Sequence, residues 1–171
     1  MTRDPTLSVR VSFQAGRVIN STLPNPLLFL ADTTAEHPPP DFTKMVIPVM
    51  SIELVEALRA RGVDNLQTFP AVLENPATGE RWANYRAVNI VGVIACADMK
   101  QSQYVDIGGT GVVLVDFTKL VIQPAKALGA LCFRLAESSD ILLVHESVRD
   151  HLLSSGRPRL NGMQFEAVRE S

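Results

Sequence analysis

The chain of 171 residues has a mass of 18.7 kDa, a net charge of −2 and a pI near 5.9. Hydrophobic residues make up 46% of the sequence and charged residues 20%, a balance that is typical of a globular protein and argues against a disordered chain. This length favours a single domain over residues 1–171, and the near-neutral charge gives no general attraction to nucleic acids or anionic membranes.

The sequence also indicates where the protein resides. The N-terminal residues lack an apolar stretch of the signal-peptide type, and the longest apolar runs are far too short to cross a bilayer. We therefore expect a cytoplasmic protein without a membrane or nucleic-acid partner. Cys96 and Cys132 both lie in hydrophobic segments and are predicted to be buried free thiols, although the sequence leaves a disulfide between them open.

Residues 1–41 are predicted to form an N-terminal extension to a main body at 42–171. Apolar and polar residues alternate over Leu7–Phe13, which predicts a half-buried strand. The short apolar run Leu27–Ala31 fits no single type of element. Three consecutive prolines at 38–40 cannot donate to a sheet or continue a helix, so they predict a stiff, extended connector.

A short strand followed by a helix opens the main body. The run Met45–Met50 is β-like but contains Pro48, which predicts an edge strand or a strand that ends there. Ser51 is the expected N-cap of the helix and Gly62 its expected C-terminal stop. The apolar residues of this helix fall on one face: Leu54, Val55 and Leu58.

The stretch after this helix predicts a long antiparallel hairpin at residues 69–97. Leu66–Leu73 is extended, and Asn75–Gly79 has the composition of a turn. Tyr85–Ala97 is predicted to be one long strand, and because both of its faces are largely apolar it belongs in the centre of a sheet. We expect Tyr85 in the core, while the pattern does not decide between core and interface for Trp82.

The C-terminal half is predicted to hold a loop, short strands and a second helix. The polar, glycine-containing stretch Met99–Gly111 is predicted to be a loop, and Glu137–Asp140 a turn. Strands are expected at 112–117, 120–122, 131–135, 141–144 and 163–168. A helical turn is expected from Pro124 to Gly129, and a helix from Glu146 to Ser154 that ends at Gly156.

Two strand–helix–glycine units align with a constant offset of 94 residues, which indicates either a pseudo-repeat or the ordinary likeness of two such units that each end in a glycine. The matched positions are Val49, Leu54, Leu58 and Gly62 in the first unit and Leu143, Val148, Leu152 and Gly156 in the second. The fold class is therefore α+β: a mostly antiparallel sheet with a long central hairpin and two packed helices in a pseudo-repeated strand–helix–strand arrangement.

No catalytic or metal-binding constellation stands out. His145 and His151 are six residues apart, whereas helical metal pairs are four apart, so His145 is expected to cap the second helix. Cys96 has no neighbouring positive charge that would activate a thiolate. The run Gly108–Gly111 leads into a strand and has no lysine placed for phosphate binding, which favours a loop over a phosphate site. We expect no metal, no cofactor and no enzymatic activity.

Residues spread over most of the chain do carry a family resemblance. In the first half they are Val49-Met50-Ser51, Leu54, Leu58, Gly62-Val63-Asp64-Asn65-Leu66-Gln67, Phe69-Pro70, Tyr85, Ala87-Val88-Asn89, Gly92, Asp98 and Ser102-Gln103-Tyr104. In the second half they are Leu120-Val121-Ile122, Phe133-Arg134-Leu135-Ala136, the helix entry at Leu142–Leu153 and Gly162-Met163-Gln164-Phe165. From about Val46 to Val168, their order and spacing resemble family eleven of the immunity proteins of bacterial polymorphic toxin systems, formerly a domain of unknown function.

This resemblance implies a protein that binds and neutralises a cognate toxin by occlusion. His145 stands where the family typically has a serine, and the triple proline lies outside the family pattern. Within the predicted loop Met99–Gly111 and beside it, we expect Asp98, Tyr104 and Asp106 to contact a basic toxin surface. Two other function classes stay open: a nucleotide-binding protein or enzyme that uses Gly108–Gly111, and a self-associating structural module.

Overall fold

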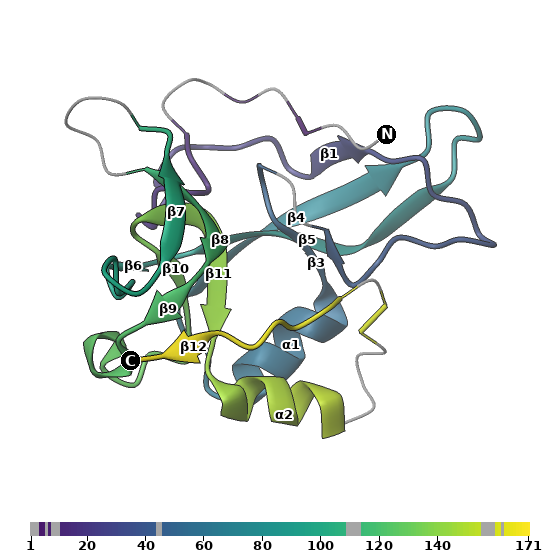
Figure 1. The fold of residues 1–171 in the computed structure, drawn as a ribbon. Helices are drawn as coiled ribbons and strands as arrows, with labels where there is room; N and C mark the ends of the chain where they lie inside the picture. Colours follow the sequence, from purple (N-terminus) through teal and green to yellow (C-terminus); the bar gives the residue numbers. More distant parts are fainter. Residues whose placement is uncertain are drawn as a thin grey trace.

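A computed structural model of the protein describes residues 4–5, 7, 11–43, 46–108, 114–154, 160–161 and 163–171. Its α+β architecture agrees with the fold class predicted from the sequence (Figure 1). The elements in chain order are β1 (Leu27–Leu30), β2 (Phe42–Thr43), β3 (Val49–Ser51), α1 (Ile52–Ala60), β4 (Leu66–Glu74), β5 (Arg81–Ile90), β6 (Val93–Ile94), β7 (Gln103–Asp106), β8 (Val115–Lys119), β9 (Val121–Ile122), the 3₁₀ helix η1 (Pro124–Ala127), β10 (Cys132–Leu135), β11 (Ser138–Val144), α2 (Glu146–Ser154) and β12 (Arg169–Glu170).

The main sheet has the strand order β1-β4-β5-β3-β2, with the predicted hairpin at its centre. β4 and β5 pair antiparallel from Leu66 opposite Ile90 to Glu74 opposite Arg81. The apolar run of uncertain type becomes β1, which pairs parallel with β4. The strand predicted at residues 7–13 lies partly outside the described residues; within it, Phe13 is buried in the core of this sheet.

The prediction of one strand over Tyr85–Ala97 is wrong. β5 starts earlier, at Arg81, and ends at Ile90, because Gly92 has a φ of 106°, a conformation that side-chain-bearing residues rarely adopt. This turn moves the chain out of the main sheet, and the next two residues form β6, which pairs parallel with β10 in a second sheet.

Pro48 comes just before β3, whereas the sequence predicted an edge strand or a strand that ends at this proline. β3 starts at Val49 and lies between β5 and β2, so it is not an edge strand. The carbonyl of Pro48 still accepts a hydrogen bond from the backbone N–H of Val88, at 2.8 Å, which places the proline beside β5 without requiring an N–H of its own. Met45, at the start of the predicted run, lies outside the described residues.

Both predicted ends of α1 are confirmed. The Ser51 hydroxyl oxygen accepts a hydrogen bond from the backbone N–H of Leu54, at 3.1 Å. At the other end Gly62 has a φ of 98°, its N–H bonds to the carbonyl of Arg59 at 2.9 Å, and the N–H of Val63 bonds to that of Leu58 at 3.1 Å. These two bonds form a Schellman motif, which satisfies carbonyls that the helix would otherwise leave unpaired.

Helix α2 follows α1 by the offset seen in the sequence repeat, since Ile52–Ala60 and Glu146–Ser154 occupy matched positions. Leu54 and Leu58 of α1 and their counterparts Val148 and Leu152 of α2 are buried in one hydrophobic cluster. Both helices lie at the same end of the molecule (Figure 1). Gly156, the expected end of the second helix, lies outside the described residues.

The repeat does not extend to the strand that follows each helix. β4 pairs over nine residues after α1, whereas the strand predicted at 163–168 is absent and only β12 pairs, parallel with β9. Residues Met163 and Phe165 instead pack their side chains against the cluster beneath the helices. The alternating apolar side chains of this segment therefore reflect packing against the core cluster and not pairing with a neighbouring strand.

The remaining sheets lie in the C-terminal half. They have the strand orders β11-β10-β6, β12-β9 and β7-β8. The turn predicted at Glu137–Asp140 is wrong in its extent, since β11 already begins at Ser138. The loop predicted at Met99–Gly111 is also wrong in part, because it contains β7. The sequence pattern misses β7 because Gln103–Asp106 is exposed along its whole length and therefore lacks a buried alternate face.

Candidate interaction surface

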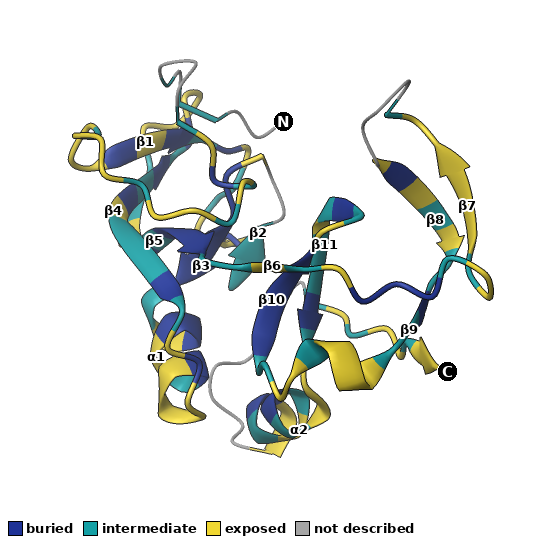
Figure 2. Ribbon diagram, turned by 90° about the vertical axis from the view of Figure 1, so that its left-hand side faces the viewer, coloured by how far each residue is buried: buried dark blue, intermediate teal, exposed yellow. Residues whose placement is uncertain are grey.

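β7 and β8 form a two-stranded hairpin that projects from the body of the protein. In Figure 2 it stands apart from the main sheet, and β7 lies on the outer side. Tyr104 is opposite Phe117, Val105 opposite Asp116, and Asp106 opposite Val115. The tip of the hairpin, residues 109–113, lies outside the described residues, and with it most of the candidate phosphate loop Gly108–Gly111 and the start of the strand predicted at 112–117.

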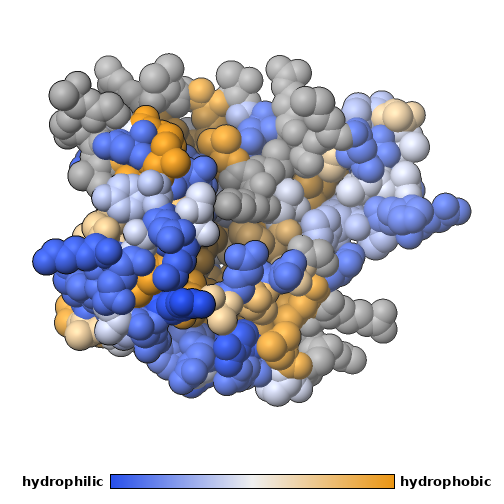
Figure 3. Space-filling view, viewed as in Figure 1, coloured by the Kyte–Doolittle hydropathy of each residue, from blue (hydrophilic) through white to orange (hydrophobic). Residues whose placement is uncertain are grey.

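Four large apolar side chains of this hairpin are exposed. Their exposed fractions are 41% for Tyr104, 59% for Val105, 60% for Ile107 and 37% for Leu114. We call these four residues the hairpin patch. In Figure 3 hydrophobic atoms reach the surface in the region of the hairpin, between hydrophilic neighbours. Apolar groups that gather on one projecting element are typical of a protein interaction site, whereas single exposed ones are ordinary.

The ring of Tyr104, the one aromatic residue of the hairpin patch, is held in place by a neighbouring aromatic ring. It meets the ring of Phe117 edge to face, with ring centroids 5.8 Å apart and an angle of 63° between the planes. Phe117 in turn packs against the core cluster that contains Cys96, Phe133 and Leu135. The exposed aromatic ring is therefore pre-positioned, which lowers the entropy that it loses when a partner binds.

Asp98 lies at the base of the hairpin and is buried, with 8% of its surface exposed. Its carboxylate accepts hydrogen bonds from the backbone N–H groups of Lys100 and Gln101, at 3.0 and 3.2 Å. The side-chain amides of Gln101 and Gln123 donate to its other oxygen. Burial opposes the ionisation of Asp98, but these bonds and one from the Ser171 hydroxyl outweigh it and lower its pKa below the ordinary carboxyl value.

Ser102 links this base to the neighbouring strand. Its hydroxyl donates to the carbonyl of Val121 at 3.2 Å and accepts from the N–H of the same residue at 2.9 Å. The backbone N–H of Asp98 also donates to the carbonyl of Val121, at 2.8 Å. The structure thus separates the three residues that the sequence suggested as partner contacts: Asp98 anchors the hairpin, while Tyr104 and Asp106 are exposed on β7.

The carboxylates on the hairpin are solvent-exposed. Asp106 accepts a hydrogen bond from the backbone N–H of Gly108, at 3.0 Å, and Asp116 lies across the hairpin. Neither carboxylate forms an ion pair with a residue that the structure describes. Sequence reasoning missed Val105, Ile107, Leu114 and Asp116, and the signal that it overlooked is the apolar character of residues on both sides of the glycine run.

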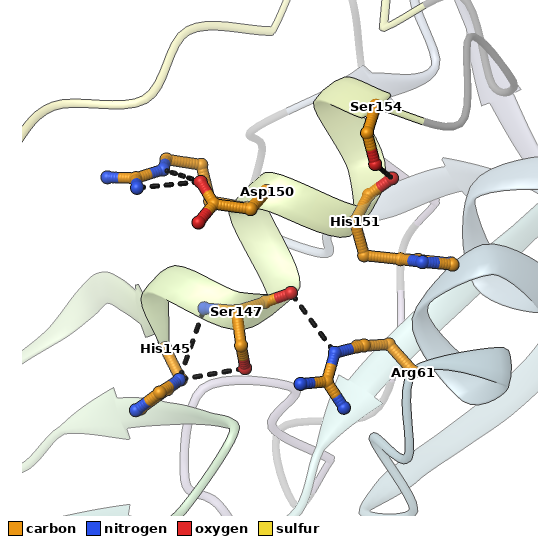
Figure 4. A network of polar contacts seen from close by, with 7 residues as sticks. Arg61, His145, Ser147, Asp150, His151 and Ser154 are labelled. Carbon is orange, nitrogen blue, oxygen red and sulfur yellow. Dashed lines mark hydrogen bonds and ion pairs between the residues drawn. The ribbon is translucent and has the colours of Figure 1, made fainter.

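The histidine at the start of α2 has the structural role predicted for it. The Nδ1 atom of His145 accepts a hydrogen bond from the backbone N–H of Ser147, at 3.2 Å, and lies 2.8 Å from its hydroxyl (Figure 4). From the end of α1, Nε of Arg61 donates to the carbonyl of Ser147 at 3.1 Å, which joins the two helices. In the described part of the chain no group of three potential metal ligands gathers.

Both cysteines are buried free thiols, as predicted, and no disulfide joins them. Burial raises the pKa of Cys132 to about 12 and also raises that of Cys96. Tyr85 is buried, as predicted, and donates its hydroxyl to the carbonyl of Pro39, at 2.8 Å; burial raises its pKa to about 12. Trp82 is partly buried and packs against the core cluster of the main sheet.

None of the helices in the described residues is long and apolar enough to cross a membrane. No curated protein matches the chain. A family model described as "Immunity protein family (Imm11)" matches residues 3–170, nearly the whole sequence. The match includes β7, β8 and the residues on which the resemblance in the sequence rests. The chain therefore belongs to the Imm11 family of immunity proteins.

Proposed function

We propose that this protein binds a cognate bacterial toxin and neutralises it by occluding the toxin surface, without catalysing a reaction. Membership of the immunity protein family supports a toxin as the partner. The observation that carries the proposal is the hairpin patch, because all four exposed apolar side chains belong to one projecting hairpin, with Tyr104 on one face and Val105, Ile107 and Leu114 on the other. A surface of this kind gains free energy when a partner covers it.

Within this surface, Tyr104 and Asp106 contact the toxin. Tyr104 offers a large, pre-positioned ring of the type that often dominates interface energetics. Asp106 contributes a negative charge that steers and orients a basic toxin surface. Asp98 does not contact the toxin itself; its hydrogen bonds to the backbone N–H groups of Lys100 and Gln101 fix the chain where the hairpin begins.

We propose that the protein acts in the cytoplasm as a single domain, with no nucleic-acid or membrane partner. Residues 1–41 add to the body at 42–171 rather than forming a separate unit. Support for this comes from β1, which pairs with β4, and from Phe13, which is buried beside it.

Co-expression tests the proposal. Cells that produce the toxin encoded beside the gene for this protein should stop growing, and the wild-type protein should restore growth and co-purify with the toxin. Tyr104→Ala should bind the toxin about tenfold or more weakly while melting at nearly the wild-type temperature. Toxin-arrested growth in the presence of abundant, folded wild-type protein would reject the proposed function.

A further inference from the structure

Besides its side chains, the hairpin presents unpaired backbone N–H and C=O groups along its outer strand, β7. The direction of these groups follows from two hydrogen bonds. The N–H of Ile107 donates to the carbonyl of Leu114 at 2.9 Å, across the hairpin. The N–H of Val115 points the other way and donates to the carbonyl of Glu137, at 3.0 Å.

Backbone groups alternate in direction along an antiparallel pair. Because Ile107 and Leu114 bond to each other, Val105 and Asp116 do so as well, and the pairs between them do not. Tyr104 and Asp106 therefore direct their N–H and C=O groups away from β8. No described residue hydrogen-bonds to these groups, and β7 pairs with β8 alone.

The main sheet differs from this open edge, because prolines precede both of its edge strands. Sheet edges that could pair with another chain are commonly blocked by prolines, lysines or very short strands. In the main sheet, Pro24 and Pro26 precede the edge strand β1, and the prolines at 38–40 precede the two-residue edge strand β2. The outer edge of β8 is partly covered by Glu137. β7, with the sequence Gln-Tyr-Val-Asp, has no proline and no lysine.

We propose that an extended strand of the toxin adds to the outer edge of β7 and continues the hairpin into a three-stranded sheet. This inference rests on the proposed function and specifies how the same site works. The backbone of Tyr104 and Asp106 supplies the hydrogen bonds, and the hairpin patch supplies the apolar contacts.

The charge of β7 decides between the two occupants that an open edge attracts. The one charged side chain of β7 is Asp106, which has no basic partner among the described residues. A toxin strand with an arginine or lysine next to it forms a charged cross-strand pair. A second copy of this chain brings only another Asp106 to the edge, so the occupant is a toxin strand rather than a second β7.

Proline substitutions test this with matched controls. Asp106→Pro removes an outward-facing N–H and leaves the bonds to β8 intact, whereas Asp106→Ala removes the carboxylate but keeps the N–H. Asp106→Pro should bind the toxin about tenfold more weakly than Asp106→Ala, with an unchanged melting temperature. Val105→Pro removes an N–H that faces β8 and should lower the melting temperature. Equal toxin binding by Asp106→Pro and Asp106→Ala would overturn the inference and leave the proposed function standing.

Amide hydrogen exchange gives a second readout that does not depend on any variant. In the free protein the amides of Tyr104 and Asp106 should exchange quickly and those of Val105 and Ile107 slowly. On addition of the toxin encoded beside this gene, the first two should become protected. Protection of Tyr104 and Asp106 in the monomeric free protein would overturn the inference, as would a concentration-dependent dimer that Asp106→Pro dissociates. Absence of any toxin binding by the wild-type protein would instead reject the proposed function itself.

Discussion

Tyr104 and Phe117 face each other across the β7–β8 hairpin, with ring centroids 5.8 Å apart. The Tyr104 side chain is 41% exposed, while Phe117 packs against the core cluster around Cys96 and Phe133. The pair thus connects the surface that we assign to the toxin with the interior that keeps this surface rigid. Its two members should respond differently to truncation.

Phe117→Ala should lower the free energy of unfolding by about 1–2 kcal/mol, because the ring is only partly buried. Compared with Phe117→Ala, Tyr104→Ala should lower the free energy of unfolding less and should weaken toxin binding more. A double-mutant cycle in urea should give a coupling of about 0.5–1.5 kcal/mol between the rings. Strictly additive losses would mean that the two rings do not support each other.

The Asp98 carboxylate should make stability depend on pH at the acid end. Its pKa is lower in the folded protein than the ordinary value of about 3.9, so the unfolded chain binds the proton more readily. Its contribution is complete above that ordinary value and is lost as the pH falls through the folded pKa. Urea unfolding of the wild type and Asp98→Asn should therefore differ at neutral pH and converge as the pH falls below about 4. A difference that stays constant with pH would contradict this assignment.

Ser51 and His145 should stabilise their helices in the same way, each by accepting a hydrogen bond from a backbone N–H at the N-terminus. Ser51→Ala should destabilise the protein by about 1 kcal/mol, and His145→Ala should do so by a similar or smaller amount. His145→Ser should keep the cap, since serine is a preferred N-cap residue. Thermal unfolding of the three variants checks this, and a His145→Ser protein as unstable as His145→Ala would show that the imidazole does more than cap α2.

The cysteines should be unreactive in the folded protein. Cys96 and Cys132 are both buried, and their raised pKa values leave little thiolate at pH 8. A chromogenic disulfide reagent should find no fast-reacting thiol in buffer and both thiols in denaturant. Rapid reaction of one cysteine in buffer would indicate local opening of the second sheet.

Arg134 is a buried cation with few hydrogen-bond partners among the described residues. Its Nη1 donates to the carbonyl of Ser139 at 2.6 Å, but Nε and Nη2 have no hydrogen-bond partner within the described residues. Burial lowers the pKa of this guanidinium. Because this hydrogen bond and the attraction of the Asp140 carboxylate offset only part of the desolvation cost, Arg134→Met should leave the protein as stable or about 1 kcal/mol more stable. Chemical denaturation measures the change, and a loss of several kcal/mol would show that the cation is needed.

Local chemistry made much of the fold predictable. Ser51 and Gly62 mark the ends of α1 through interactions within a few residues, and the apolar β4–β5 hairpin is joined by a recognisable turn. Long-range pairing was not predictable in the same way. The break after Ile90 depends on the positive φ of Gly92 and on the distant partner β10, and the short β12 depends on β9.

The candidate site was predictable in part for the same reason. Tyr104 and Asp106 stood out as polar or aromatic residues in a stretch rich in glycine. Asp98 stood out as well, but a single sequence does not reveal that its carboxylate is buried and accepts hydrogen bonds from the backbone N–H groups of Lys100 and Gln101. β7 was missed because a strand exposed on both faces has no alternating pattern.

The packing of the hairpin has a consequence for how such a protein can change. Neither of the two core clusters formed around the main sheet and the helices contains a residue of β7 or β8. The hairpin rests on the third cluster through Phe117. Substitutions at the hairpin patch and in the main core should therefore have nearly additive effects on stability. If the hairpin contacts the toxin as we propose, substitutions at Tyr104, Val105, Ile107 and Leu114 change the partner that is bound while the main core stays the same, so the same fold can follow changes in the toxin surface.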